Sequence, residues 1–246
     1  DVEVDPDAAR VALEEAVEEK PDDAAVYLAL EALAGKLGDG DLRARALSQR
    51  AERSEHPAWR AHLLLDSAEL ALADGDFDAA IARIERAIEQ KSAATFASLS
   101  ALEAAGRIAE RFDVVARALE SKAALLLRSV GDSATADALG VPAWVRNEAH
   151  AVDAWLAAAD AQRRRGEVAD AAALLDQALT KLPGEPALVH ARMVVADVTG
   201  DTQKTAELAV SALEAGAKGK VAAGLWLRVA EAAAVVALAG GGGGVE

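Results

Sequence analysis

One spacing of large, small and glycine residues occurs twice in this chain of 246 residues. In both sets, successive members lie 4, 7, 5, 4 and 3 residues apart. The sets are Trp155, Ala159, Gly166, Ala171, Leu175 and Ala178, and Leu64, Ala68, Gly75, Ala80, Ile84 and Ala87. Two antiparallel helices with a glycine turn would produce this spacing, because small residues let the helices cross closely. The repetition predicts a row of such helix pairs.

Composition favours an all-helical chain. Hydrophobic residues make up 52% of the sequence but aromatic residues only 3%, and alanine supplies most of the apolar content. Alanine is the strongest helix former, and the β-branched and aromatic runs typical of strands are nearly absent. We therefore expect an all-α solenoid of antiparallel helix pairs, with about 11–12 helices, in which each pair packs only against its neighbours.

Prolines, glycines and capping aspartates mark the expected helices. A helix over 7–20 resembles the second half of a pair, and Asp22 and Asp23 can cap a helix that ends at Leu37. The turn Gly38-Asp39-Gly40 then carries two extra residues. A further pair, with its turn near 111–113, falls within 92–130. The other helices are expected over 41–54, 57–74, 77–91, 143–165, 167–182, 186–199, 202–215 and 220–239.

The same prolines and glycines also predict the domain organisation. We expect an N-terminal array over 1–130, a loop or insertion over 131–143, a C-terminal array over 144–239 and a flexible glycine-rich tail over 240–246. A break as long as 131–143 is uncommon in a tight array, so it is either a functional insertion or a seam between two sub-arrays. The apolar helix 220–239 is a buried or capping helix, or covers a surface meant for further repeats or a second subunit. Arg228 and Glu231 disfavour a membrane span.

The paired spacings resemble the tetratricopeptide repeat family, whose unit of 34 residues is a helix–turn–helix with small residues at the crossing. The best match ends with Pro183, the next has Ser92 in that place, and Gly200 follows Gly166 by 34 residues. The residues that define the repeat are Ala68, Gly75, Ala80, Ala87, Trp155, Ala159, Gly166, Ala171, Leu175, Ala178, Pro183 and Gly200.

This resemblance implies a non-catalytic scaffold or adaptor that binds a peptide or protein in a concave groove lined by the first helix of each pair. The lysine and asparagine clamp with which some family members hold a C-terminal carboxylate is absent, because acidic, apolar or alanine residues stand there. Carried onto this chain, the groove residues are His62, Leu65, Asp66, Glu69, Asp153, Leu156, Asp160, Arg163, His190 and Val194.

A formal net charge of −15 restricts the partners. Binding of nucleic acid or of an anionic membrane needs clustered Lys and Arg, so we expect neither, and a basic partner is weakly favoured. The acidic start of the chain, from Asp1 to Asp7, is interpreted as a solvated segment. A homo-oligomer through the terminal helices stays open. A cytoplasmic location is favoured, while the composition leaves an exported or periplasmic one open.

No chemistry of catalysis is recognisable in the sequence. The chain has no cysteine, and its four histidines show no metal-ligand spacing, so we expect no metal and no cofactor. Phosphate-binding and hydrolase motifs are missing as well. Arg163, Arg164 and Arg165 suit the negative end of a helix dipole. Trp144, Trp155 and Trp226 are expected to fill the core.

Two alternatives to an independent scaffold stay open. The chain could be a regulatory or assembly arm of a larger signalling or cell-envelope protein, which the half-pair at its start and the glycine tail favour. The other alternative, an all-helical enzyme, would require a deep closed pocket with convergent polar groups.

Overall fold

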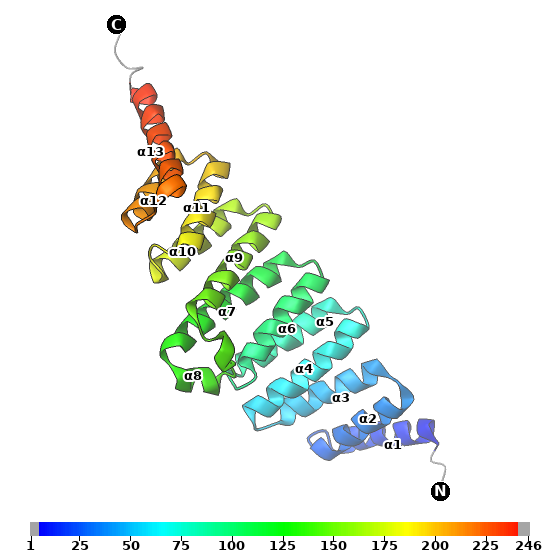
Figure 1. Ribbon diagram of the computed structural model, residues 1–246. Coiled ribbons are helices and arrows are strands. Elements are labelled where there is room, and N and C mark those ends of the chain that lie inside the picture. The colour runs from blue at the N-terminus through cyan, green and yellow to red at the C-terminus, as the bar shows by residue number, and fades with distance from the viewer. Residues whose placement is uncertain (1–4, 241–246) are drawn as a thin grey trace. The chain divides into compact units, whose positions relative to one another are not determined.

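In a computed structural model, the described residues 5–240 form helices almost throughout (Figure 1). They contain thirteen α-helices, one 3₁₀ helix and no strand, which confirms the all-α expectation. The described residues contain one α-helix more than the 11–12 expected. The additional helix is α8, which has six residues and lies inside the anticipated insertion. The acidic residues 1–4 and the glycine-rich residues 241–246 lie outside the described part. The helices are α1 Pro6–Glu19, α2 Ala24–Leu37, α3 Gly40–Arg53, α4 Pro57–Ala73, α5 Phe77–Glu89, α6 Thr95–Ile108, α7 Phe112–Gly131, α8 Ser133–Ala138, η1 Ala143–Val145, α9 Glu148–Arg164, α10 Val168–Lys181, α11 Pro186–Thr199, α12 Thr202–Glu214 and α13 Gly219–Gly240.

The chain divides into two compact units, residues 1–148 and 149–246. In the first unit α1 to α8 pack in chain order, each against the next, and α4 also contacts α6. In the second unit α10 to α13 pack in chain order. Trp155 of α9 lies against Lys181 at the end of α10, with 5.6 Å from the ammonium nitrogen to the ring centroid. The segment expected as a loop over 131–143 belongs to the first unit.

Four of the hairpin turns contain a left-handed glycine, and in three of these an aspartate caps the next helix. The φ angles of these glycines lie between 68° and 83°, a region that only glycine enters without strain. An aspartate follows three of the four glycines, and its carboxylate accepts a hydrogen bond of 2.9–3.1 Å from the backbone N–H three residues later. The glycines are Gly38, Gly75, Gly166 and Gly200.

The expectation of a widened turn at Gly38-Asp39-Gly40 is wrong. Gly38 is the left-handed residue, Asp39 caps α3, and Gly40 is already the first residue of that helix. The error came from taking Pro57 as the end of a repeat, equivalent to Pro183. Pro57 instead begins α4, just as Pro186 begins α11. Proline suits the first helical position, because no backbone N–H is needed there.

The α6–α7 hairpin makes its turn without glycine. Glu110 adopts the left-handed conformation, with a φ of 55°. The neighbouring Arg111 ties the turn to two helices: its guanidinium donates hydrogen bonds of 3.1 Å to Asp113 of α7 and to Asp78 of α5. The hydrogen bond from Arg111 lowers the pKa of Asp113 below its ordinary value. The turn therefore forms at a residue for which this backbone conformation is unfavourable.

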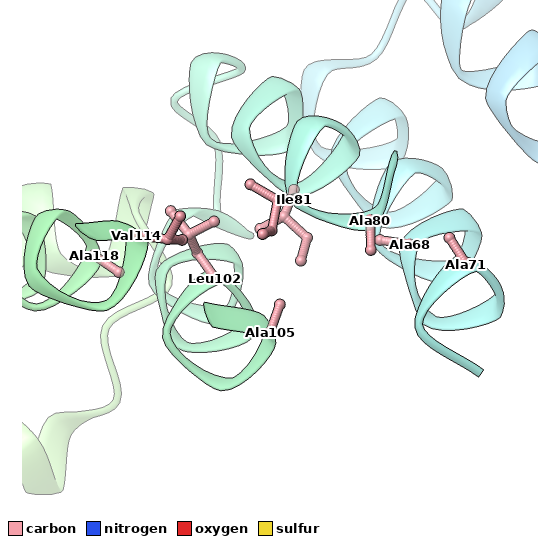
Figure 2. Packing of buried hydrophobic residues seen from close by; sticks show 9 residues of the cluster. Ala68, Ala71, Ala80, Ile81, Leu102, Ala105, Val114 and Ala118 are labelled. Atoms are coloured by element: carbon pink, nitrogen blue, oxygen red, sulfur yellow. The ribbon is translucent and has the colours of Figure 1, made fainter. Parts of the chain in front are cut away.

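Small residues sit where the helices cross. Ala68 of α4 and Ala80 of α5 face each other in Figure 2, and their exposed fractions are 1% and 0%. The same cluster continues through Ile81 of α5 and Leu102 of α6 to Val114 of α7. Because a short helix buries only one face against the preceding helix, it needs the next helix to cover its other face. The core is accordingly a ribbon that runs from helix to helix.

The insertion after α7 is an ordered cover on the first unit. Asp132 caps α8 and accepts a hydrogen bond of 3.0 Å from the Thr135 N–H; the hydrogen bond from the Thr135 hydroxyl lowers the pKa of Asp132. Ala136 and Val141 are buried, with exposed fractions of 0% and 2%. The Phe96 N–H of α6 donates a hydrogen bond of 3.1 Å to the Leu139 carbonyl of the insertion.

The helix expected over 143–165 is wrong for its first five residues. Residues 143–145 form a single 3₁₀ turn, and α9 begins at Glu148. The Arg146 guanidinium donates a hydrogen bond of 2.9 Å to the Val141 carbonyl and forms an ion pair with Asp137. These contacts hold residues 143–146 against the insertion.

The core-filling role predicted for tryptophan holds for only one of the three residues. Trp155 is 1% exposed, whereas Trp144 and Trp226 are 76% and 60% exposed, so the prediction is wrong for these two. Trp144 lies in the 3₁₀ turn and not in the helix that would have carried it inward. Trp226 lies on α13, which packs mainly through Leu225 and Val229. Among the described helices, none has the length and hydropathy that spanning a membrane requires.

We predict that Glu110→Gly stabilises the first unit by roughly 0.5–1 kcal/mol, because the relief of left-handed strain exceeds the added chain entropy of glycine. The measurement is the midpoint of urea unfolding. Glu110→Ala is the control, since it removes the same side chain and keeps the strain. A glycine variant no more stable than the alanine variant would contradict the prediction.

We also predict that Gly140→Ala destabilises the first unit by about 3 kcal/mol, through left-handed strain and overpacking together. A Cβ atom at Gly140 would lie 1.7 Å from the Ala93 carbonyl oxygen. The control is Gly75→Ala, where φ is equally positive but no atom lies within 4 Å of the added carbon. Equal losses of stability in the two variants would show that the insertion does not pack as described.

Candidate peptide-binding surface

A depression of about 230 Å³ lies between the first helices of two neighbouring hairpins in the first unit. The side of α2 and the start of α4 form its apolar walls, and the end of α3 closes it. We call it the Trp59 depression. It is lined by Ala24, Ala25, Leu28, Arg50, Arg53, Ser54, Trp59 and Leu63.

Two large apolar side chains of the depression face solvent. Trp59 and Leu28 are each 52% exposed, although both belong to well-formed helices. Trp59 stands in the first turn of α4, and Arg60 fixes that turn. The Arg60 Nε donates hydrogen bonds of 3.1 Å to the Ala51 carbonyl and of 3.2 Å to the Ser54 carbonyl. The exposed tryptophan is therefore held by a helix start that is itself tied to α3. Rigid exposed aromatic side chains are common anchors in protein interfaces.

The arginines at the rim hold the helices together. Arg50 of α3 forms an ion pair with Glu31 of α2. The Arg53 guanidinium lies 4.3 Å from the centroid of the Tyr27 ring and donates a hydrogen bond of 2.6 Å to the Pro21 carbonyl. The hydroxyl of Tyr27 donates a hydrogen bond of 3.0 Å to the same carbonyl. This network fixes the distance between α2 and α3 and so the width of the depression.

An acidic row continues from the depression along α4. Of the residues predicted to line a groove, His62, Asp66 and Glu69 are exposed, and their spacing places them on one helix face. Trp59 precedes His62 by three residues and Asp66 by seven, so it lies on the same side. Leu65, also predicted for the groove, is half-buried and packs against the core clusters beside α4. The structure thus joins three of the four residues predicted on α4 into one surface with Trp59.

The second unit presents the remaining predicted residues on α9 and α11. On α9, Asp153 and Arg163 are exposed, while Leu156 and Asp160 are half-buried. Asp160 forms an ion pair of 2.8 Å with Arg164, one turn further along. On α11, His190 is exposed and Val194 is half-buried.

The residues predicted to define the repeat lie in the packing and the turns. The alanines, together with Trp155 and Leu175, are at most 4% exposed, and the three glycines form left-handed turns. Pro183 lies in the connection between α10 and α11, and it is exposed.

The described residues contain neither a metal-binding cluster nor an unsatisfied buried polar side chain. No group of three or more His, Cys, Asp or Glu among them could bind a metal ion. Every buried side-chain nitrogen or oxygen of the described part has a hydrogen-bond partner.

Sequence reasoning missed Leu28 and Trp59, although the repeat register contained a signal for both. Leu28 stands at the position of Leu65, Leu156 and His190, all of which were assigned to the groove. Trp59 occupies the register of His150, a polar residue, and this indicates a position near the surface. Applying the register to the first hairpin would have identified Leu28.

Comparison with known proteins agrees with the helix pairs seen here. Residues 152–195, which span most of α9, all of α10 and most of α11, match the family model for a tetratricopeptide repeat. No curated protein sequence matches the chain.

Among solved structures, one similar chain is YrrB, described as a TPR protein with an unusual peptide-binding site: identity 14%, coverage 87% of this chain and 97% of that one, TM-score 0.34. Another is the TPR domain of P58(IPK): identity 11%, coverage 95% of this chain and 62% of that one, TM-score 0.34. The described chain is thus a row of helix pairs in which residues 152–195 match a tetratricopeptide repeat.

Proposed function

We propose that this protein is a non-catalytic scaffold whose first unit binds a short segment of a partner protein on the surface formed by α2 and α4. The observation that carries this proposal is the pair of exposed apolar side chains, Trp59 and Leu28, at the Trp59 depression. A rigid helical frame supports such binding, because little conformational freedom is lost when the partner docks.

The chemistry of the surface specifies the segment. A depression of about 230 Å³ accommodates one large apolar side chain, such as leucine or phenylalanine. The acidic row of Asp66 and Glu69 follows on the same face of α4, so basic residues beside the apolar anchor are favoured. The formal net charge of −15 adds long-range attraction for a basic segment. We infer a partner segment with one apolar anchor flanked by Lys or Arg.

The test is a calorimetric titration with a synthetic peptide of about ten residues that carries a central phenylalanine and flanking lysines. We predict that Trp59→Ala weakens binding at least tenfold, as expected for a central anchor of an interface. Asp66→Lys combined with Glu69→Lys should reverse the preference, so that a peptide with flanking glutamates binds better than the lysine peptide.

Trp226→Ala is the matched control, because Trp226 is also exposed but lies on α13 in the second unit. It should leave peptide affinity unchanged within about twofold. Trp155 is unsuitable for this purpose, since removing a buried tryptophan costs about 3–5 kcal/mol of stability. Equal affinities of the Trp59→Ala and Trp226→Ala variants would refute binding at the depression.

A further inference from the structure

The outward side of α13 is an apolar helix face that no described helix covers. α13 packs on α12, and Leu225 and Val229 contact the core of the second unit. Leu227 and Trp226 point elsewhere, with exposed fractions of 59% and 60%. Ala223, Ala230 and Ala234 lie on the same side as Leu227 and are exposed. We call these five residues the α13 face.

The repeat register shows which kind of element fits this face. Ala223 and Leu227 follow Val189 and Met193 by 34 residues. In α11, Val189 and Met193 are buried in a cluster with Leu208 and Ala209 of α12, the returning helix of that pair. The α13 face is therefore the equivalent of the face that α11 buries against an antiparallel helix.

We propose that a second copy of this chain supplies that helix, so that two α13 helices pair antiparallel in a symmetric dimer. A twofold axis perpendicular to α13 makes the two helices antiparallel, which is also the direction of the two helices in a repeat hairpin. The dimer would thus complete, between two molecules, the packing that each hairpin makes within one.

The edge of the face is complementary to itself. Lys220, Gly224, Leu227, Glu231 and Ala234 form a stripe with intervals of 4, 3, 4 and 3 residues, the spacing of a seam between paired helices. With the twofold axis between residues 225 and 226, Lys220 of one copy faces Glu231 of the other. Leu227 then faces Gly224, where an added Cβ would meet no atom within 4 Å. Glu231 also lies 3.7 Å from Arg228 in its own chain, which orients the carboxylate at this edge.

Charge and area fix the expected strength. Lys220, Arg228 and Glu231 are the charged residues of α13, so the helix is nearly neutral in an otherwise acidic chain and little repulsion opposes its pairing. In this register residues 219–232 of the two helices overlap over about 20 Å, and a strip of helix width on both copies amounts to about 500 Å². An interface of this size is smaller than that of most specific complexes, so we expect a weak, reversible dimer with a dissociation constant above about 100 µM.

Sedimentation equilibrium of the whole chain, over an about hundredfold range of concentration, tests the dimer. We expect Leu227→Glu to raise the dissociation constant at least tenfold, because it places a charge in the seam. Val198→Glu is the matched control: Val198 is 64% exposed on α11, and its substitution should leave the dimer unchanged. Circular dichroism should show the same helix content in both variants.

Two results would overturn the proposal: a monomer at every concentration, or a dimer that Leu227→Glu does not weaken. Neither variant touches the Trp59 depression, so failure here leaves the proposed peptide binding standing.

The register is tested by disulfide formation, since the chain has no native cysteine. Under mild oxidation, a mixture of the Gly224→Cys and Leu227→Cys proteins should form the mixed disulfide at least about fivefold faster than either protein links to itself. Preferential linking of each variant to itself would overturn the antiparallel register, because parallel helices bring identical residues together.

Discussion

The close approach of helices at alanine is the constraint on which this structure depends. Ala68 and Ala80 face each other with almost no exposed surface, and Ala171 and Ala178 are equally buried in α10. A larger side chain at such a crossing would push the helices apart, and the displaced helix would no longer present its other face correctly to the next one. One small residue in each helix thus determines the geometry of the following pair. The left-handed glycines contribute by returning the chain within two residues, so that the crossing alanines meet.

Much of this architecture is encoded locally, and that part could be predicted. The turn at Gly75 with its cap at Asp76 follows from residue preferences within a few positions, and so does the start of α4 at Pro57 once proline is recognised as a first helical residue. Features that depend on distant atoms could not be predicted. Glu110 enters the left-handed region because packing of α6 against α7 demands a turn there, and its own preference opposes it. The helix predicted from residue 143 begins only at Glu148, because Arg146 bonds a carbonyl of the insertion.

The candidate site was predictable only in part for the same reason. The register placed His62, Asp66 and Glu69 on an exposed face of α4, where the structure has them. The exposure of Trp59 depends on how α2 and α4 are held against α3, through Arg50 and Arg53 on one side and through Arg60 on the other. Tryptophan as a residue type gives little guidance, because Trp155 is buried and Trp144 and Trp226 are not. Apolar residues that remain outside after the helix pairs are assembled mark the surfaces proposed for the peptide and for the second copy.

Packing mainly between neighbours along the chain also affects how the protein folds during synthesis. Because each helix of the first unit finds its partner within the next few dozen residues, the mean sequence separation of its packing contacts is short, and domains of that kind fold fast. A hairpin emerging from the ribosome can settle on its predecessor before the rest of the polypeptide has been synthesised. The insertion that covers α6 and α7 arrives last in this order. The first unit is therefore complete once Val145 has emerged and docked, while α10 to α13 still await translation.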